Sequence, residues 1–276
     1  MVVTGASTGF GAAIARHLAG RRGGFRVFGT VRRAEDEAAL ERAGVSAVRM
    51  DVTDSAGIAR AREQVERALA GAPLAGLVNN AGIPAAGPLE LFPLDELRRV
   101  LEVNLVGAVA VTQAFLPLLK ASRGRIVNMS SVAGRGALPF LGPYAASKFG
   151  LEAISDSLRR ELLPFGVKVI VIEPGTFKTA IWSKVEVMDL HRYAGTPYES
   201  VLDRFRRGAL RGAEQAPPPD KVVRVVWRAL TARRPPLRVI VTPHGWLDRV
   251  PMWLPDRWLD WLIYRVLWRR VHLPPA

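Results

Sequence analysis

Short runs of β-branched and apolar residues alternate along the chain with longer stretches of helical character. Such alternation is typical of βαβ units and predicts a parallel sheet with helices on both faces. We expect strands at 2–4, 27–30, 47–50, 77–79, 125–129, 167–172 and 239–241. We expect helices at 10–20, 34–43, 55–70, 95–119, 144–163, 220–232 and 256–270.

These elements place the chain in the α/β class, as a Rossmann-type, doubly wound parallel sheet of about seven strands. We expect residues 1–276 to form a single domain with a C-terminal extension at about 243–276, because no repeat or Gly/Ser-rich linker divides them. Only four residues precede a glycine loop at the start, which is short for a first strand. Either the natural start lies upstream of Met1, or this strand is short and frayed.

The composition of the chain excludes some kinds of functional site. The 276 residues are 49% hydrophobic, enough for a substantial core, and contain no cysteine, which excludes disulfides and thiolate metal sites. The four histidines show no ligand spacing, so we expect no metal site. The longest apolar stretch, 100–119, is interrupted by polar residues and favours a buried or dimer-forming helix over a membrane span. Nothing at the N-terminus resembles a signal peptide, so the expected compartment is the cytoplasm.

The formal charge of +14 raises the question of nucleic-acid binding. Only six of the 39 basic residues are lysine, and no recognition motif accompanies the charge. Residues 221–276 hold 11 basic and 3 acidic side chains, a net +8, and five of the seven tryptophans lie beyond residue 243. A basic, aromatic segment is typical of a membrane surface. It also fits a helix packed on the body of the protein, covering the substrate mouth or joining an oligomer.

The segment TGASTGFG, residues 4–11, follows a predicted strand and begins a predicted helix. Gly5, Gly9 and Gly11 let the backbone turn tightly and approach a pyrophosphate, which the helix N-terminus then binds. Their spacing, three residues and then one, differs from the usual dinucleotide fingerprint.

The segment YAASK puts Tyr144 and Lys148 one helical turn apart on the same face. A fixed positive charge within a few ångströms lowers the pKa of a phenol, so we expect Lys148 to make Tyr144 a usable acid and base near neutral pH. The same pattern also fits a surface pair on an amphipathic helix, and the neighbouring motifs decide between the two.

Six motifs in order resemble the short-chain dehydrogenase/reductase family: the loop TGxxxGxG, NNAG at 79–82, Asn104, NMSS at 128–131, YAASK, and EPGTFKT at 173–179. Ser131 precedes Tyr144 by the family's customary 13 residues. The chain looks most similar to the branch acting on steroids, retinoids and other lipids. The resemblance implies an NAD(P)-dependent oxidoreductase that moves a hydride between nicotinamide and a carbonyl or alcohol carbon.

The resemblance also implies roles for individual residues. Tyr144 would be the general acid/base, Ser131 would hold the substrate oxygen, Lys148 would bind the nicotinamide ribose, and Asn104 would anchor a water linked to Lys148. The implied cofactor contacts are Gly5, Ser7, Thr8, Gly9, Phe10, Gly11, Arg32, Arg33, Asp51, Val52, Asn80, Ala81, Gly82, Tyr144, Lys148, Pro174, Gly175 and Thr179.

The residues that follow the second predicted strand indicate whether the site prefers NAD or NADP. A site for NAD carries a carboxylate about 20 residues after the loop, yet that position here is Val31, followed by Arg32 and Arg33. Two guanidiniums favour the 2′-phosphate of NADP, with Arg32 as the better-placed contact and NAD as the alternative.

Substrate contacts are expected in two apolar segments, 132–143 and an insert at about 180–216, which suit a lipophilic alcohol or ketone. Ser131, Leu138, Tyr144 and Trp182 are the expected substrate contacts. The further candidates for the wall are Phe140, Leu141, Ile181, Val185, Val187, Met188 and Tyr193.

We expect a homodimer or homotetramer formed through helices 95–119 and 144–163, no nucleic acid, and peripheral membrane contact as one use of the tail. Two alternative functions stay open at this point. The first is an epimerase or dehydratase on the same fold. The second is a non-catalytic, NADP-binding sensor or scaffold, although such proteins typically lose the tyrosine or lysine that this chain keeps.

Overall fold

The sheet confirms the predicted class. A computed structural model describes residues 1–20, 24–179, 182, 189–243, 245 and 254–269. Its sheet has seven parallel strands in the order β3-β2-β1-β4-β5-β6-β7. The strands are β1 (Val2–Val3), β2 (Phe28–Val31), β3 (Ser46–Arg49), β4 (Gly76–Asn79), β5 (Arg125–Met129), β6 (Lys168–Pro174) and β7 (Arg238–Val241). The strand order reverses between β1 and β4, which is where open α/β sheets bind ligands.

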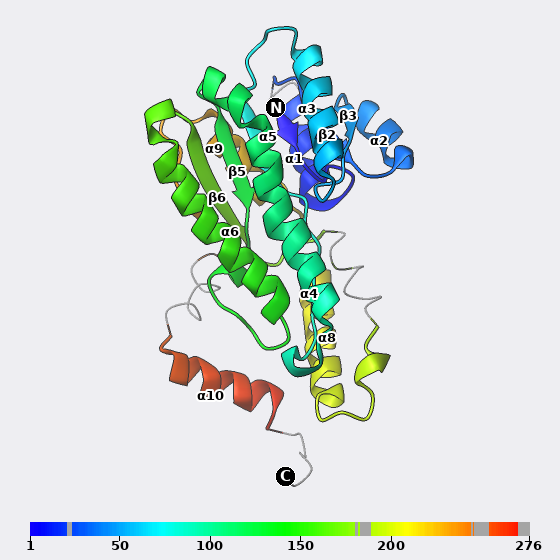
Figure 1. The fold of residues 1–276 in the computed structure, drawn as a ribbon. Coiled ribbons are helices and arrows are strands. Elements are labelled where there is room, and N and C mark those ends of the chain that lie inside the picture. Colours follow the sequence, from blue (N-terminus) through cyan, green and yellow to red (C-terminus); the bar gives the residue numbers. More distant parts are fainter. Residues whose placement is uncertain (21–23, 180–181, 183–188, 244, 246–253, 270–276) are drawn as a thin grey trace.

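Helices cover both faces of the sheet (Figure 1). The helices that the structure describes are α1 (Gly9–Ala19), α2 (Glu37–Glu41), α3 (Ser55–Leu69), α4 (Leu94–Leu101), α5 (Gly107–Ser122), α6 (Gly142–Glu161), α8 (Glu199–Glu214), α9 (Asp220–Thr231) and α10 (Asp256–Leu267). Successive strand residues point to opposite faces. Val3 therefore packs in a core with α1 and α9, and Val2 in a second core with α3 and α5.

The first strand is short but not frayed. Val2 and Val3 are fully buried, and each pairs with both β2 and β4. The Met1 ammonium donates a hydrogen bond to the Arg26 carbonyl at 2.7 Å, and burial lowers the pKa of this ammonium to about 6.

Two helix predictions need correction. The expected helix 95–119 is interrupted by a π-helical turn, Glu102–Val106, between α4 and α5. Such turns are frequent at functional sites, and this one carries Asn104. The expected helix 34–43 is instead a 3₁₀ turn, Ala34–Asp36, followed by the short α2. By length and composition, the stretch Leu94–Ser122 is apolar enough to cross a membrane, a test that core helices of soluble proteins also pass.

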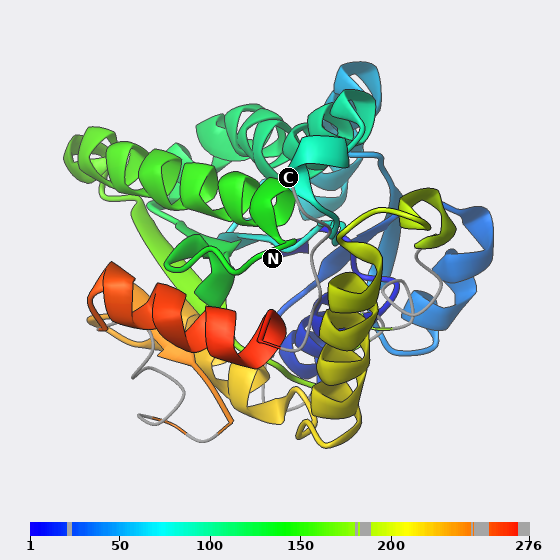
Figure 2. The ribbon, with the colours of Figure 1, turned by 90° about the horizontal axis from the view of Figure 1, so that it is seen from below.

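The helix α8 was not predicted, and it joins α10 beyond one end of the sheet (Figures 1 and 2). The Phe140 ring lies 5.6 Å from Phe205 of α8 and 6.3 Å from Trp268, measured between ring centroids. Buried Val201 and Leu202 complete this small core. It fixes α8 and the end of α10 against the segment 132–143, beside the carboxyl ends of β4 to β6.

Candidate active site

One cavity of about 990 Å³ occupies the carboxyl edge of the sheet. Its walls come from the glycine loop, the ends of β2 to β6, the segment 130–141, the start of α6, and the helices α8 and α10. Every predicted cofactor contact except Gly11 lines it, as do the predicted substrate contacts Ser131, Leu138, Tyr144 and Trp182. Asn104 does not. Residues far apart in the sequence therefore converge on one space.

The glycine loop is shaped for close approach. Gly5 and Gly9 have φ values of +63° and +58°, which residues other than glycine rarely adopt. A Cβ on Gly11 would lie 2.2 Å from the Gly5 carbonyl oxygen, so this glycine packs beneath the loop and does not face the cavity. Thr8 precedes α1 and makes no side-chain cap, which leaves the first N–H groups of the helix available to an anion.

Thr4 locks this loop to the end of β4. Its hydroxyl oxygen accepts hydrogen bonds from the backbone N–H groups of Asn80 and Ala81 at 2.9 and 3.0 Å. The Asn80 side chain donates back to the Thr4 and Gly5 carbonyls at 3.0 and 3.2 Å. This role of Thr4 was not predicted, although the residue begins the segment TGASTGFG.

Tyr144 and Lys148 lie as the spacing predicts. Gly142 and Pro143 begin α6, Tyr144 lies in its first turn, and the Lys148 Nζ is 5.6 Å from the centre of the Tyr144 ring. Lys148 is 5% exposed, and its ammonium donates to the Met129 carbonyl at the end of β5 at 2.8 Å. The Ser131 hydroxyl accepts from the Ala133 N–H at 3.1 Å and also contacts the Tyr144 phenol.

The electrostatics differ from the expectation for Tyr144. Burial raises the pKa of the Tyr144 phenol, and the Ser131 hydroxyl only partly opposes the rise. The predicted net lowering of the Tyr144 pKa is therefore wrong, because burial acts in the opposite direction and is the largest cause. Burial also lowers the pKa of the Lys148 ammonium to about 8, against the opposing effect of the Glu152 carboxylate. At neutral pH Tyr144 is protonated and Lys148 is mostly charged.

The side chain of Asn104 forms hydrogen bonds with other residues of the protein. Its Oδ1 accepts from the Ile83 N–H at 2.8 Å, and its Nδ2 donates to the Ile83 carbonyl at 3.0 Å and to the Ser147 hydroxyl at 3.1 Å. Ser147 in turn donates to the Tyr144 carbonyl at 2.7 Å. Asn104 thus fixes the loop after β4 to the first turn of α6, and both side-chain donors are used. Its link to Lys148 through a water stays a prediction.

The end of β2 presents Arg32 and Arg33, both exposed, to the cavity. Arg33 forms an ion pair with Glu35 at 3.0 Å. Burial alone would raise the pKa of Asp51, but hydrogen bonds from Thr53 and the charge of Arg32 hold it below its usual value. Asp36 also lines the cavity and was missed, because the residue count after the loop ended at Val31.

The substrate wall is partly different from the prediction. Leu138, Leu141 and Trp182 line the cavity, and the Trp182 indole donates to the Phe177 carbonyl at 2.8 Å. Phe140 and Tyr193 are instead buried in the small core beneath it. Ile181, Val185, Val187 and Met188 lie outside the described residues.

The lining residues from α8 and α10 were missed, among them Phe205, Ala209 and Leu267. Val201, Phe205 and Ala209 recur at helical spacing, a signal that could have revealed α8. Within the described part of the chain, no group of three or more histidine or acidic side chains could hold a metal ion.

Comparison with known proteins agrees with this geometry. The short chain dehydrogenase family matches residues 1–189. The NADPH-dependent 3-dehydrocapnine reductase of Ornithobacterium rhinotracheale is 37% identical over 275 residues, covering 96% of each chain. Retinol dehydrogenase 5 of Homo sapiens is 38% identical over 276 residues, covering 93% of this chain and 83% of that protein. The crystal structure of a Burkholderia cenocepacia short chain dehydrogenase in complex with NADP is 25% identical, with a TM-score of 0.74 and 95% of each chain covered.

Proposed function

The chain belongs to the short-chain dehydrogenase family, and from that premise we propose how its cavity works. It is an NAD(P)-dependent oxidoreductase of the branch that includes retinol dehydrogenases. The observation that carries the mechanism is the convergence of Ser131, Tyr144 and Lys148 on the cavity that the glycine loop also lines. The relatives named above are a reductase and a dehydrogenase, so they lend no support to an epimerase, a dehydratase or a sensor.

The described lining fits a phosphate-bearing nucleotide. It contains five basic side chains, Arg32, Arg33, Lys148, Arg204 and Arg211, and two acidic ones, Asp36 and Asp51. When bound, the nicotinamide supplies or accepts the hydride. Lys148 is in place to hold the ribose hydroxyls, while the loop 5–9 and the N-terminus of α1 would receive the pyrophosphate.

Tyr144 is the proton donor for a carbonyl substrate. The phenol is protonated at neutral pH and can give its proton to the oxygen of a ketone or aldehyde, whereas the burial that raises its pKa makes it a weaker acid. Ser131 would hold the carbonyl oxygen beside the phenol while negative charge develops there. The apolar wall of Leu138, Leu141 and Phe205 favours a lipophilic ketone, aldehyde or alcohol, of steroid or retinoid type.

Replacing Tyr144 by phenylalanine removes the proton donor and leaves the ring in place. We expect kcat for NADPH-dependent reduction of lipophilic ketones to fall by about 10²- to 10⁴-fold. Nucleotide binding, measured by fluorescence, should persist, since the glycine loop and Lys148 are unchanged, so the loss should fall mainly on kcat. Equal turnover by Tyr144→Phe and the wild type would remove this residue from the mechanism.

We further propose that NADP is the preferred cofactor, because Arg32 faces the cavity and no carboxylate occupies position 31. Arg32→Ala should raise KM for NADPH by at least about tenfold and leave KM for NADH nearly unchanged, because a charge-assisted bond to the 2′-phosphate is lost. Arg33→Ala is the matched control with a smaller effect, since Arg33 is paired with Glu35. A wild-type preference for NADH in kcat/KM would contradict the assignment.

A homodimer or homotetramer fits the exposed apolar side chains on α4, the π-helical turn after it, and α6. Leu94, Val106 and Phe149 are 62%, 46% and 44% exposed. They lie on the helices proposed for the subunit contact, which would cover them. Sedimentation velocity at micromolar concentration tests this, and a monomer would contradict it.

The exposed side of α10 supports peripheral membrane contact. Trp258 and Trp261 are 69% and 56% exposed, and Arg265 lies over the Trp261 ring at 4.6 Å. Aromatic and basic side chains of this kind bind the headgroup region of anionic lipid. Only Leu267 and Trp268, at the far end of the helix, join the small core.

The tail is tested by replacing both tryptophans. We expect Trp258→Ser with Trp261→Ser to abolish sedimentation with vesicles containing phosphatidylserine at low salt, because the apolar contact is lost. Trp227→Ser on α9 is the control, since this tryptophan is 36% exposed on another helix. Absence of vesicle binding by the full-length wild type ends the proposal.

A further inference from the structure

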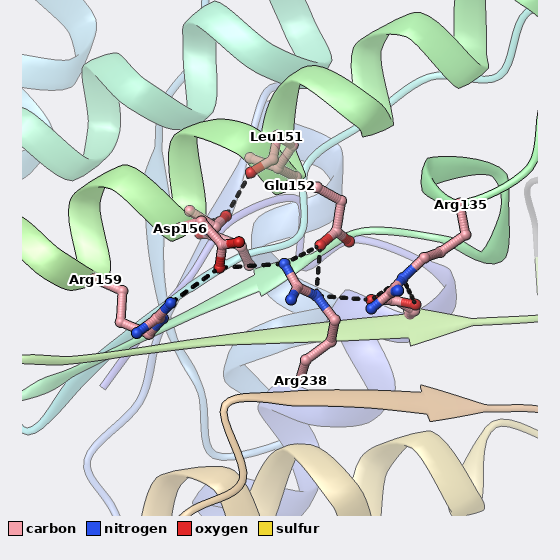
Figure 3. A network of polar contacts seen from close by, with 9 residues as sticks. Arg135, Leu151, Glu152, Asp156, Arg159 and Arg238 are labelled. Carbon is pink, nitrogen blue, oxygen red and sulfur yellow. Dashed lines mark hydrogen bonds and ion pairs between the residues drawn. The ribbon is translucent and has the colours of Figure 1, made fainter.

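A buried network of charged side chains lies directly behind Lys148. Glu152 follows Lys148 by one turn of α6 and is 8% exposed. Its Oε2 accepts hydrogen bonds from the Arg238 guanidinium of β7 at 2.8 Å. Arg238 also pairs with Asp156, one further turn along α6, at 3.3 Å. Figure 3 shows Arg238 between these two carboxylates.

The same network reaches two other segments of the cavity. Arg238 also forms an ion pair with Oε1 of Glu173 at 3.1 Å, and Glu173 is fully buried at the end of β6, next to Pro174 and Gly175. Arg135, four residues after Ser131, donates to both oxygens of Glu173 at 3.0 and 3.1 Å. One arginine on β7 thus connects the helix of Tyr144 and Lys148 with the cofactor loop and with the serine segment.

The hydrogen bonding of Glu152 in this network is incomplete. Its Oε2 is shared with Arg238, whereas its Oε1 is buried and has no hydrogen-bond partner among the described residues. A buried, incompletely paired carboxylate is costly unless a neighbouring cation stabilises it. Lys148, on the same face one turn away, has only the Met129 carbonyl as a hydrogen-bond partner in the described structure. Glu152 is therefore a negatively charged neighbour of Lys148 on the same helix face, and one of its two oxygens is left free by Arg238.

The other groups around Lys148 do not replace Glu152. Tyr144 lies one turn before Lys148 on α6, and the other charged groups of the network are Glu173 on β6, Arg238 on β7 and Arg135 after Ser131. Among these and Glu152, only the Glu152 carboxylate raises the pKa of Lys148, against the larger lowering by burial. Asn104 does not stabilise the ammonium either, since its side chain carries no charge and its amide donors bond to Ile83 and Ser147.

We propose that Glu152 is a positioning residue that keeps Lys148 in its charged form, and that Arg238, which pairs with both Glu152 and Glu173, limits this effect by partly neutralising the Glu152 carboxylate. Through this arrangement, the charge on the ammonium depends on a strand, β7, that contributes no described side chain to the cavity wall. The consequence for catalysis rests on the nucleotide site proposed above, in which a charged Lys148 binds the ribose. The titration of Lys148 itself can be measured without nucleotide.

The chain has only six lysines, so Lys148 can be followed by NMR of ¹³C-labelled lysine side chains. Its signal is the one absent from Lys148→Met. In the wild type we expect a titration midpoint near 8. Glu152→Gln should lower the midpoint by roughly one unit or more, because the nearby negative charge is gone. Arg238→Met should raise it, because the Glu152 carboxylate then acts on Lys148 without a counter-charge.

These opposite shifts separate positioning from simple loss of structure, which would move both variants the same way. Asp156→Asn is the matched control: the carboxylate lies one turn further along and bonds the same arginine, so the midpoint should stay near 8. An unshifted midpoint in Glu152→Gln, or the absence of any lysine titrating near 8 in the wild type, overturns the proposal. If Arg238→Met does not fold, the pair Glu152→Gln and Asp156→Asn still decides.

Binding of NADPH as a function of pH completes the test. Wild-type affinity should weaken above pH 8 as Lys148 loses its proton, and in Glu152→Gln the weakening should begin at a pH lower by the NMR shift. A shifted NMR midpoint without any NADPH binding would refute the proposed function and leave the role of Glu152 intact. Binding whose pH dependence is the same in the wild type and Glu152→Gln would refute the link between Glu152 and the nucleotide.

Discussion

The buried ammonium of Lys148 is the constraint on which the site depends. A buried charge is tolerated only when it is paired and hydrogen-bonded. Here the Met129 carbonyl accepts a hydrogen bond from the ammonium, and the nearby Glu152 carboxylate supplies the opposite charge. Because Met129 ends β5 and α6 carries the lysine, the pairing fixes the helix against the carboxyl edge of the sheet. Tyr144 and Ser131 face one cavity as a result.

The glycine loop lies at the same edge of the sheet, close to these residues. Thr4 bonds the loop to the end of β4, and Asn104 bonds the following segment to α6 through Ser147. Three separate hydrogen-bonded links therefore hold the glycine loop, the serine segment and the Tyr144 helix around one space. The site is built from strand ends, which explains why residues from positions 5 to 179 can share it.

Local patterns predicted what depends on local structure. Strands such as 125–129 were found from their β-branched runs, and the relation of Tyr144 to Lys148 follows from the length of one helical turn. Tertiary effects could not be predicted this way. The π-helical turn at Asn104 depends on hydrogen bonds to Ile83, the raised pKa of Tyr144 depends on burial, and Glu152 meets Arg238 across 86 residues of sequence. The helix α8 was missed although its apolar spacing was visible.

The most direct test of this account is the binding of NADPH to Lys148→Met at pH 7, measured by isothermal titration calorimetry, with folding checked by circular dichroism. A charge-assisted hydrogen bond contributes about 1.5–3 kcal/mol, so we expect the affinity to weaken by at least about tenfold relative to the wild type. Equal affinity of the two proteins for NADPH would contradict the central place given to the buried ammonium.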